Sequence, residues 1–150
     1  MPTHSETRRL PYTAEQMYDL VADVARYPEF LPWTAAARIL ETRDEGDRTI
    51  MLADLVISFK VFREKFASRV TLYPEARKID TEYLDGPFKH MVSNWAFVDA
   101  PEGGVDVSFH VDFEFRSGLL QRTVSLFFNE AMQRVVRAFE ARARELYGKA

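Results

Sequence analysis

The segment from Val105 to Phe115 constrains the fold of this chain more than any other. Its apolar residues occupy every second position: Val105, Val107, Phe109, Val111, Phe113 and Phe115. A period of two predicts a strand with one buried face. A long segment with helical spacing follows within a few residues. We therefore expect an aromatic sheet face and one long helix to enclose either a solid core or a hydrophobic ligand.

The long helix is predicted to begin at Ser117 or Gly118 and to end at Gly148, because serine caps helices and glycine stops them. Its arginines fall largely off the apolar stripe. The stripe consists of Leu120, Val124, Phe127, Phe128, Met132, Val135, Phe139 and Leu146.

The N-terminal part predicts a short strand over Thr7 to Leu10 and one short helix. Thr13 is a suitable N-cap, and Gln16 stands where a capping box needs its partner. The helical spacing that follows is expected to end before Pro28. Residues 27–33 then combine two prolines with three aromatic residues, so we expect them to fold onto another part of the molecule.

The middle of the chain reads as strands separated by turn residues. The predicted strands span residues 35–43, 49–58, 62–72, 78–84, 91–98 and 105–115. Short connections favour antiparallel neighbours. The sequence thus predicts an α+β fold, a curved antiparallel sheet wrapped around the terminal helix, in a single domain over residues 1–150.

Composition limits the classes of function. The 150 residues contain no cysteine, which excludes disulfides and thiolate chemistry. Residues 1–9 are polar, so we expect neither a secretory signal nor a spanning helix, and we place the chain in the cytoplasm. A net charge of -3 gives no general attraction to nucleic acid, and DNA is not an expected partner.

Four segments carry a resemblance to a known family: residues 21–33 (VADVARYPEFLPW), 59–70 (FKVFREKFASRV), 84–89 (LDGPFK) and 112–115 (DFEF). They resemble the coenzyme Q-binding START-domain family. This family includes a branch of RatA-type ribosome-association toxins and belongs to the superfamily of polyketide cyclases and lipid-transfer domains. Many relatives have cysteine where this chain has Thr34, so no role is assigned to a thiol there.

The resemblance implies a helix-grip fold with an apolar cavity that binds ubiquinone, another polyprenyl quinone or a similar lipid. It implies no enzymatic chemistry and no required cofactor, and a role in respiratory electron transport as a carrier or chaperone. Two alternatives stay open: a RatA-type protein that binds the large ribosomal subunit, and a cyclase-like enzyme.

A prenyl quinone needs apolar walls and one or two donors for its ring carbonyls. Trp95 is the predicted donor, through its indole N–H. The alternative is that the predicted contact residues, named in the next sentence, simply fill the core. The predicted ligand contacts are Phe30, Leu31, Trp33, Phe62, Phe66, Trp95, Phe97, Phe109, Val111, Phe113, Phe128, Met132 and Val135.

Three turn-flanked segments are unusually apolar: residues 30–33, 59–62 and 86–88. Exposed apolar patches mark binding surfaces, so we expect peripheral contact with the inner face of a membrane at the cavity mouth. The alternative is that these segments close the ends of the core. The predicted membrane contacts are Trp33, Phe59, Phe62 and Phe88.

The sequence offers little for catalysis or metal binding. His4 lies in a polar leader and His90 beside a turn, whereas His110 shares the polar face of the last strand with carboxylates. A solvated face explains this spacing better than a metal or proton-transfer site. The arginines of the terminal helix alternate with glutamates, which is typical of ion pairing on a solvated helix face rather than of phosphate binding.

Overall fold

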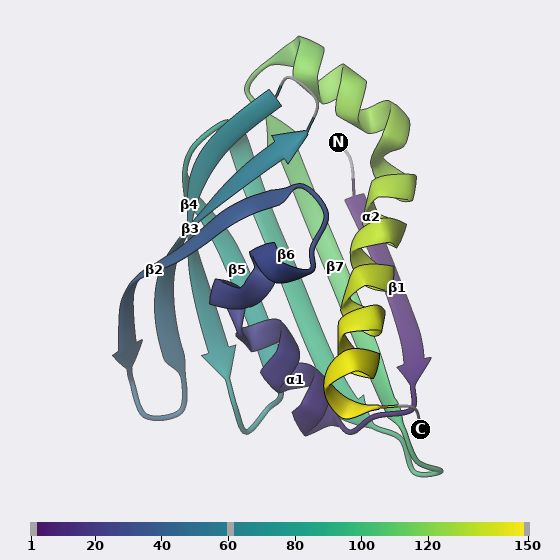
Figure 1. Cartoon of the computed structure of the whole chain (residues 1–150). Coiled ribbons are helices and arrows are strands. Elements are labelled where there is room, and N and C mark those ends of the chain that lie inside the picture. The colour runs from purple at the N-terminus through teal and green to yellow at the C-terminus, as the bar shows by residue number, and fades with distance from the viewer. Residues whose placement is uncertain (1–2, 60–61, 149–150) are drawn as a thin grey trace.

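The computed structural model describes residues 3–59 and 62–148 (Figure 1). Within these ranges the chain forms one sheet of seven strands, two α-helices and a short 3₁₀ helix, η1. The elements are β1 (Thr3–Leu10), α1 (Ala14–Ala22), η1 (Val24–Glu29), β2 (Thr34–Asp44), β3 (Thr49–Phe59), β4 (Phe62–Tyr73), β5 (Lys78–Asp85), β6 (Phe88–Asp99), β7 (Val105–Phe115) and α2 (Gly118–Tyr147).

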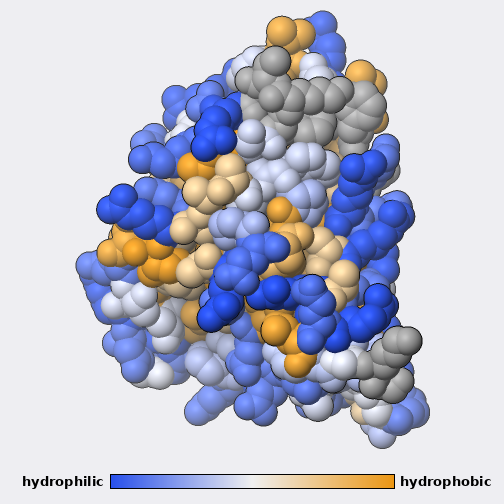
Figure 2. Space-filling view, viewed as in Figure 1, coloured by the Kyte–Doolittle hydropathy of each residue, from blue (hydrophilic) through white to orange (hydrophobic). Residues whose placement is uncertain are grey.

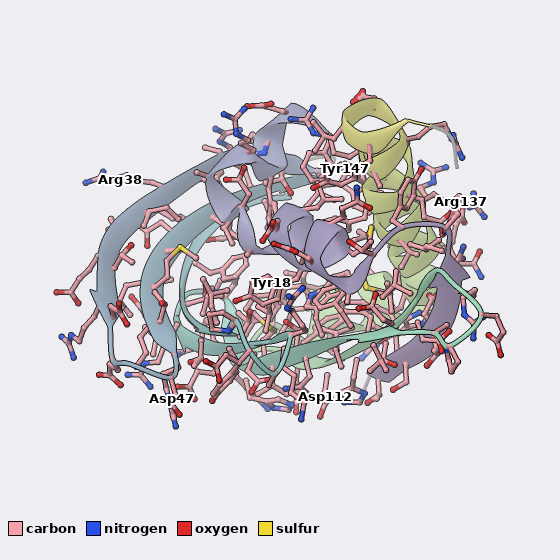
Figure 3. The ribbon with its side chains drawn as sticks, turned by 90° about the horizontal axis from the view of Figure 1, so that it is seen from below. Tyr18, Arg38, Asp47, Asp112, Arg137 and Tyr147 are labelled. Carbon is pink, nitrogen blue, oxygen red and sulfur yellow. The ribbon has the colours of Figure 1, made fainter. Side chains whose placement is uncertain are left out.

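The sheet is antiparallel throughout and curls around the helices. Its order is β1-β7-β6-β5-β4-β3-β2, so each strand from β2 to β7 pairs with its neighbours in sequence and β1 joins the far edge. Seen from below, the strands form a curved wall with α1 and α2 on its concave side (Figure 3). The predicted α+β helix-grip architecture is confirmed.

The seventh strand matches its prediction at both ends. All six alternate residues from Val105 to Phe115 are buried, on the side of β7 that contacts α1 and α2, whereas the residues between them are partly exposed. The edge strand next to β7 is β1, and it begins at Thr3 rather than at the predicted Thr7. Backbone pairing from Thr3↔Asp112 to Leu10↔Val105 extends this polar segment as a strand, because the edge of β7 supplies its hydrogen-bond partners.

Helix α2 begins and ends where the sequence predicts. The Ser117 side chain accepts a hydrogen bond from the Leu120 N–H at 3.2 Å, and Gly148 follows the helix with a φ of 79°. Leu146 was predicted on the buried stripe but is 52% exposed. In the last turn Tyr147 makes the contact instead, since its ring lies 6.0 Å from that of Tyr12.

Helix α1 carries the predicted capping box. Thr13 Oγ1 accepts from the Gln16 N–H at 3.0 Å, and Gln16 Oε1 accepts from the Thr13 N–H at 3.0 Å. The helix ends at Ala22, and η1 follows with Pro28 inside it. Met17 and Val21 are almost fully buried, so α1 closes the lower half of the concave face.

Candidate functional site

The lower part of the concave face is an aromatic cluster that joins the sheet to α2. Trp95 on β6 and Phe109 on β7 are cross-strand partners with ring centroids 4.4 Å apart. Phe139 of α2 meets Trp95 edge-on at 5.1 Å and also contacts Phe30 at 5.4 Å and Tyr27 at 5.6 Å. These rings bring together residues that are distant in sequence, and Phe30, Trp95 and Phe109 among them were predicted as ligand contacts.

Close packing leaves little space inside this lower cluster. A gap of about 20 Å³ remains beside Trp95, Phe109 and Phe139, lined also by Met17 and Val136. This volume is about that of one water molecule, so it does not admit an isoprene unit. The lower cluster is therefore core, and a ligand needs another part of the concave face.

A second aromatic cluster occupies the upper part of the concave face. Phe128 of α2 lies 5.0 Å from Phe113, and Phe113 lies 5.2 Å from Phe115. Phe66 of β4 meets Phe88 edge-on at 5.4 Å. Phe66, Phe113 and Phe128 were predicted as ligand contacts, and the structure places all three on this apolar wall.

Phe88 was predicted to contact a membrane, but its side chain is buried. Its ring stacks on Phe115 at 4.7 Å, and only 9% of the residue is exposed. A bulge between Phe88 and His90 shifts the register of β6 against β7, so that Phe88 lies opposite Phe115. The side chain of Phe88 therefore belongs to the core and not to the surface.

The remaining predicted contacts are distributed over the same concave face and its margin. Phe97 and Val111 are buried, whereas Met132 and Val135 of α2 and Leu31 are partly buried against the core. Trp33 is partly buried after η1 with a φ of 63°, and its carbonyl accepts from the Ser58 N–H at 2.8 Å. The side chains of Phe59 and Phe62 lie outside the part of the chain that the structure describes.

Hydroxyl groups interrupt the apolar wall on three adjacent strands. Ser68 of β4 pairs with Tyr83 of β5, and Thr81 of β5 pairs with Ser93 of β6. All four share the concave face, because they alternate with outward residues and stand in line with the buried Phe66, Ile79 and Trp95. We call Ser68, Thr81, Tyr83 and Ser93 the hydroxyl row.

The sequence analysis missed the hydroxyl row, although a signal for it exists. Thr81 and Tyr83 continue the parity of Ile79, and Ser93 continues that of Trp95. Ser68 is 1% exposed, whereas Thr81, Tyr83 and Ser93 are partly exposed. Because these three face the helices and not the solvent side, their partial exposure shows where the concave wall is incompletely covered.

One polar atom in this row is buried and unpaired. Among the residues that the structure describes, the Tyr83 hydroxyl is the side-chain N or O atom that is buried without a hydrogen-bond partner. The Tyr83 ring meets Phe88 edge-on at 5.4 Å. The predicted donor, Trp95, lies instead among Phe97, Phe109 and Phe139.

A charged network closes the gap between β1 and α2. His4 Nε2 lies 2.6 Å from Glu6 Oε1, and Arg8 binds both Glu6 and Glu140 at 2.5 Å. Burial raises the pKa of Glu6, but hydrogen bonds from Arg8 and His4 outweigh burial and hold this pKa below its ordinary value. His4 is thus part of the wall, 6.2 Å from the Phe128 ring, and not of a polar leader as predicted.

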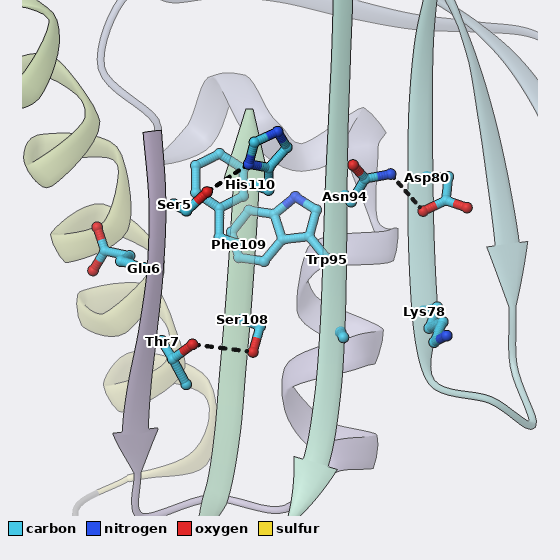
Figure 4. A pocket seen from close by; sticks show the side chains of 11 residues that line it. Ser5, Glu6, Thr7, Lys78, Asp80, Asn94, Trp95, Ser108, Phe109 and His110 are labelled. Atoms are coloured by element: carbon cyan, nitrogen blue, oxygen red, sulfur yellow. Dashed lines mark hydrogen bonds between the residues drawn. The ribbon is translucent and has the colours of Figure 1, made fainter. Parts of the chain in front are cut away.

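The convex face of the sheet holds a broad, shallow hollow of about 550 Å³ (Figure 4). Its polar groups bind one another across the strands: Ser5 with His110 at 2.5 Å, and Asn94 with Asp80 at 2.9 Å. His110 therefore lies on the polar face, where the sequence predicts it. Within the described ranges no three His, Cys, Asp or Glu side chains are grouped to hold a metal ion.

On the face shown in Figure 2, the hydrophobic side chains form separate patches that are bordered by hydrophilic ones. Leu119 and Leu126 of α2, which the sequence analysis did not single out, are 75% and 77% exposed. In the part of the chain that the structure describes, no helix has the length and hydropathy to cross a bilayer.

Comparisons with known proteins agree with this architecture. The family described as polyketide cyclase/dehydrase and lipid transport matches residues 10–140. The ribosome association toxin RatA of Rickettsia prowazekii is 35% identical over 149 residues, which cover 97% of this chain and 99% of that protein. The mitochondrial coenzyme Q-binding protein COQ10 homolog B of Xenopus laevis is 33% identical over 150 residues. These residues cover 97% of this chain and 59% of that protein.

A solved structure has the same architecture. An 18 kDa protein of Caulobacter crescentus superposes with a TM-score of 0.83 at 37% identity, over 99% of this chain and 100% of that chain. The curved sheet and the long terminal helix are therefore shared over the whole length.

Proposed function

Because the chain belongs to the polyketide cyclase/dehydrase and lipid transport family, we propose that it binds a hydrophobic lipid without altering it, and that this lipid is ubiquinone or another polyprenyl quinone. The family resemblance predicted from the sequence is confirmed by these relatives. In this role the protein supports respiratory electron transport by carrying the quinone or presenting it at a membrane.

The observation that carries the proposal is the hydroxyl row within an otherwise apolar wall. A polyprenyl quinone combines a long apolar tail with two ring carbonyls that accept hydrogen bonds. Phe66, Phe113 and Phe128 offer apolar contact for the tail, while Thr81 and Ser93 offer hydroxyl donors beside them. A wall of this composition suits a ligand that is hydrophobic over most of its length and polar at one end.

Organic extraction of the purified protein, followed by lipid mass spectrometry, tests the proposal. We expect about one unmodified quinone per chain, because a pocket of this kind holds a single ligand. Ser93→Phe places a ring on the concave face and should lower the yield. Asn94→Phe, one residue further on the convex face, is the matched control and should retain it. Only trace lipid in the unaltered protein, or a chemically converted quinone, would contradict the proposal.

Loading from a bilayer requires contact with a membrane surface. We assign this contact to the predicted Trp33, Phe59 and Phe62, which come from the η1–β2 connection and the β3–β4 hairpin. Liposome flotation of the double variant Trp33→Ser, Phe62→Ser should recover less protein with the vesicles than flotation of the unaltered chain. Equal recovery would remove these residues from the membrane contact.

Association with the large ribosomal subunit is the second candidate, favoured by the near full-length similarity to proteins named RatA. Several cations of α2 are occupied within the protein: Arg142 binds Glu29 at 2.7 Å and Arg134 binds Glu130 at 3.4 Å. Sedimentation with purified large subunits separates the candidates. Binding that disappears at moderate salt supports ribosome association, whereas stoichiometric quinone without sedimentation supports the lipid carrier.

A further inference from the structure

The unpaired hydroxyl of Tyr83 is the strongest unexplained polar feature of the concave face. A buried hydroxyl without a partner destabilises the folded protein, so such groups are rare and need an explanation. In the part of the chain that the structure describes, no protein group accepts from or donates to this oxygen. A phenylalanine would keep the ring packing against Phe88 and avoid this penalty.

No neighbour in the described part of the wall pairs with the Tyr83 hydroxyl. Ser68 lies opposite on β4, and its Oγ donates to the Ala53 carbonyl at 3.5 Å and makes no hydrogen bond to Tyr83. The adjoining rings are Phe88, and behind it Phe66 and Phe115, which offer no strong acceptor. A bound molecule that brings its own acceptor would satisfy this hydroxyl.

The same surroundings define what the acceptor can be. The ring of Tyr83 packs against the aromatic ring of Phe88, and the hydroxyls of Thr81 and Ser93 stand on the same face of the sheet. A ligand with a carbonyl oxygen in an apolar frame fits this arrangement. A pure hydrocarbon would leave the hydroxyl unpaired.

We propose that Tyr83 is the residue that recognises the head group, and that its hydroxyl donates a hydrogen bond to a carbonyl oxygen of the bound lipid. This assignment rests on the proposed function and adds selectivity to it: the site prefers lipids with a carbonyl head group over hydrocarbons of similar length. Tyr83 takes the role predicted for Trp95, because among the described residues the Tyr83 hydroxyl, and not the Trp95 indole, is buried without a hydrogen-bond partner.

The test compares two probes on ligand-free protein, decylubiquinone and the hydrocarbon squalene, by their displacement of anilinonaphthalene sulfonate. Tyr83→Phe removes only the hydroxyl oxygen. We expect its affinity for decylubiquinone to fall about tenfold, the value of one hydrogen bond, with no change for squalene. The urea midpoint of the ligand-free variant should stay equal or rise.

Tyr147→Phe is the matched control, since the Tyr147 hydroxyl already donates to the Gln16 carbonyl at 3.0 Å. This variant should lower the urea midpoint and leave both affinities unchanged. If Tyr83→Phe binds decylubiquinone as tightly as the unaltered protein, the assignment of Tyr83 is overturned and the proposed function stands. If the unaltered protein binds squalene but not decylubiquinone, the carbonyl preference is overturned. If it binds neither probe, both proposals fail.

Discussion

At the scale of single residues, Gly86 determines how β5 can turn into β6. Its φ is +144°, and a Cβ placed there would lie 2.6 Å from the Phe66 Cβ and 3.0 Å from the Phe66 Cα. No side chain fits such a position without moving β4. The glycine therefore allows the turn to pack directly on the strand that carries Phe66.

Gly86→Ala should destabilise the protein more than an alanine at another left-handed glycine. Gly46→Ala is the control, because Gly46 has a φ of +91° with no described atom within 4 Å of its Cβ position. We expect the free energy of unfolding of Gly86→Ala to be about 1 to 3 kcal/mol lower than that of Gly46→Ala. Urea unfolding measures the free energy of unfolding of both variants. Equal values would show that β4 can move to make room for the added Cβ without a loss of stability.

Glu6 gives the stability of the protein a specific dependence on pH. Its pKa in the folded protein is below the ordinary value of 4.5 because Arg8 and His4 favour the carboxylate. A carboxyl with a lowered pKa adds stability above the pKa of the unfolded chain. That stability disappears as pH falls through the lower folded value.

Glu6→Gln should therefore be less stable than the unaltered protein at pH 7, and the difference should shrink as the pH falls below the ordinary value of 4.5. Urea midpoints measured across this range test the sign. Glu75→Gln, in the exposed turn after β4, is the control and should follow the unaltered protein. A constant difference for Glu6→Gln at every pH would contradict the role of its ionisation.

Particular residues show how far the sequence determines the fold and the site. The alternation of Val105 to Phe115, the Thr13 capping box and the Ser117 cap depend on local patterns, and all are confirmed. The inward direction of Thr81 and Ser93 could be predicted from the parity of Ile79 and Trp95 on the same strands, although the polar residues do not reveal it themselves. The burial of Phe88 depends on a bulge in β6, and the inward direction of His4 depends on the pairing of β1 with β7. These last two features follow from tertiary contacts, which a local pattern does not contain.

At the scale of elements, α2 is held to the edge of the sheet by one ion pair beside the aromatic clusters. Arg8 on β1 reaches Glu140 on α2 at 2.5 Å, one residue after the buried Phe139. The side chains are 36% and 24% exposed, so solvent screens this pair and its contribution is modest. It fixes the position of the helix relative to β1 more than it adds stability.

Glu140→Ala should release this part of α2 while the sheet stays intact. We expect a loss of about 0.5 to 1 kcal/mol and faster amide exchange around Phe139 and Ala143. Asp106→Ala removes the Arg9 to Asp106 pair, which ties β1 to β7 at 2.6 Å, and should leave exchange in α2 unchanged. Unchanged exchange in both variants would show that apolar packing alone positions the helix.

At the scale of the whole molecule, the sheet, α1 and α2 form one cooperative unit around the concave face. The aromatic clusters connect β4, β6 and β7 with α2, so a ligand seated on that wall contacts most of the fold at once. Binding to the folded state alone must then stabilise the entire molecule.

Decylubiquinone at roughly 100 times its dissociation constant should raise Tm by roughly 5 to 10 °C, equivalent to about 2.7 kcal/mol. Differential scanning calorimetry measures this shift. Ser93→Phe should show a smaller shift at the same ligand concentration, and Asn94→Phe should show the full shift. A Tm that is insensitive to the ligand in the unaltered protein would show that the folded state does not bind decylubiquinone in preference to the unfolded chain.

The pairing of β1 with β7 has a consequence for how the chain is made. Strands β2 to β7 follow one another as neighbours, so each can join the sheet as it leaves the ribosome. Thr3 pairs with Asp112, so the first strand cannot join the sheet until the last strand has been made. Until then His4, Glu6 and Arg8 lack their positions in the sheet. The concave wall is thus completed only near the end of translation, and an interrupted chain that lacks β7 has a sheet without its final edge.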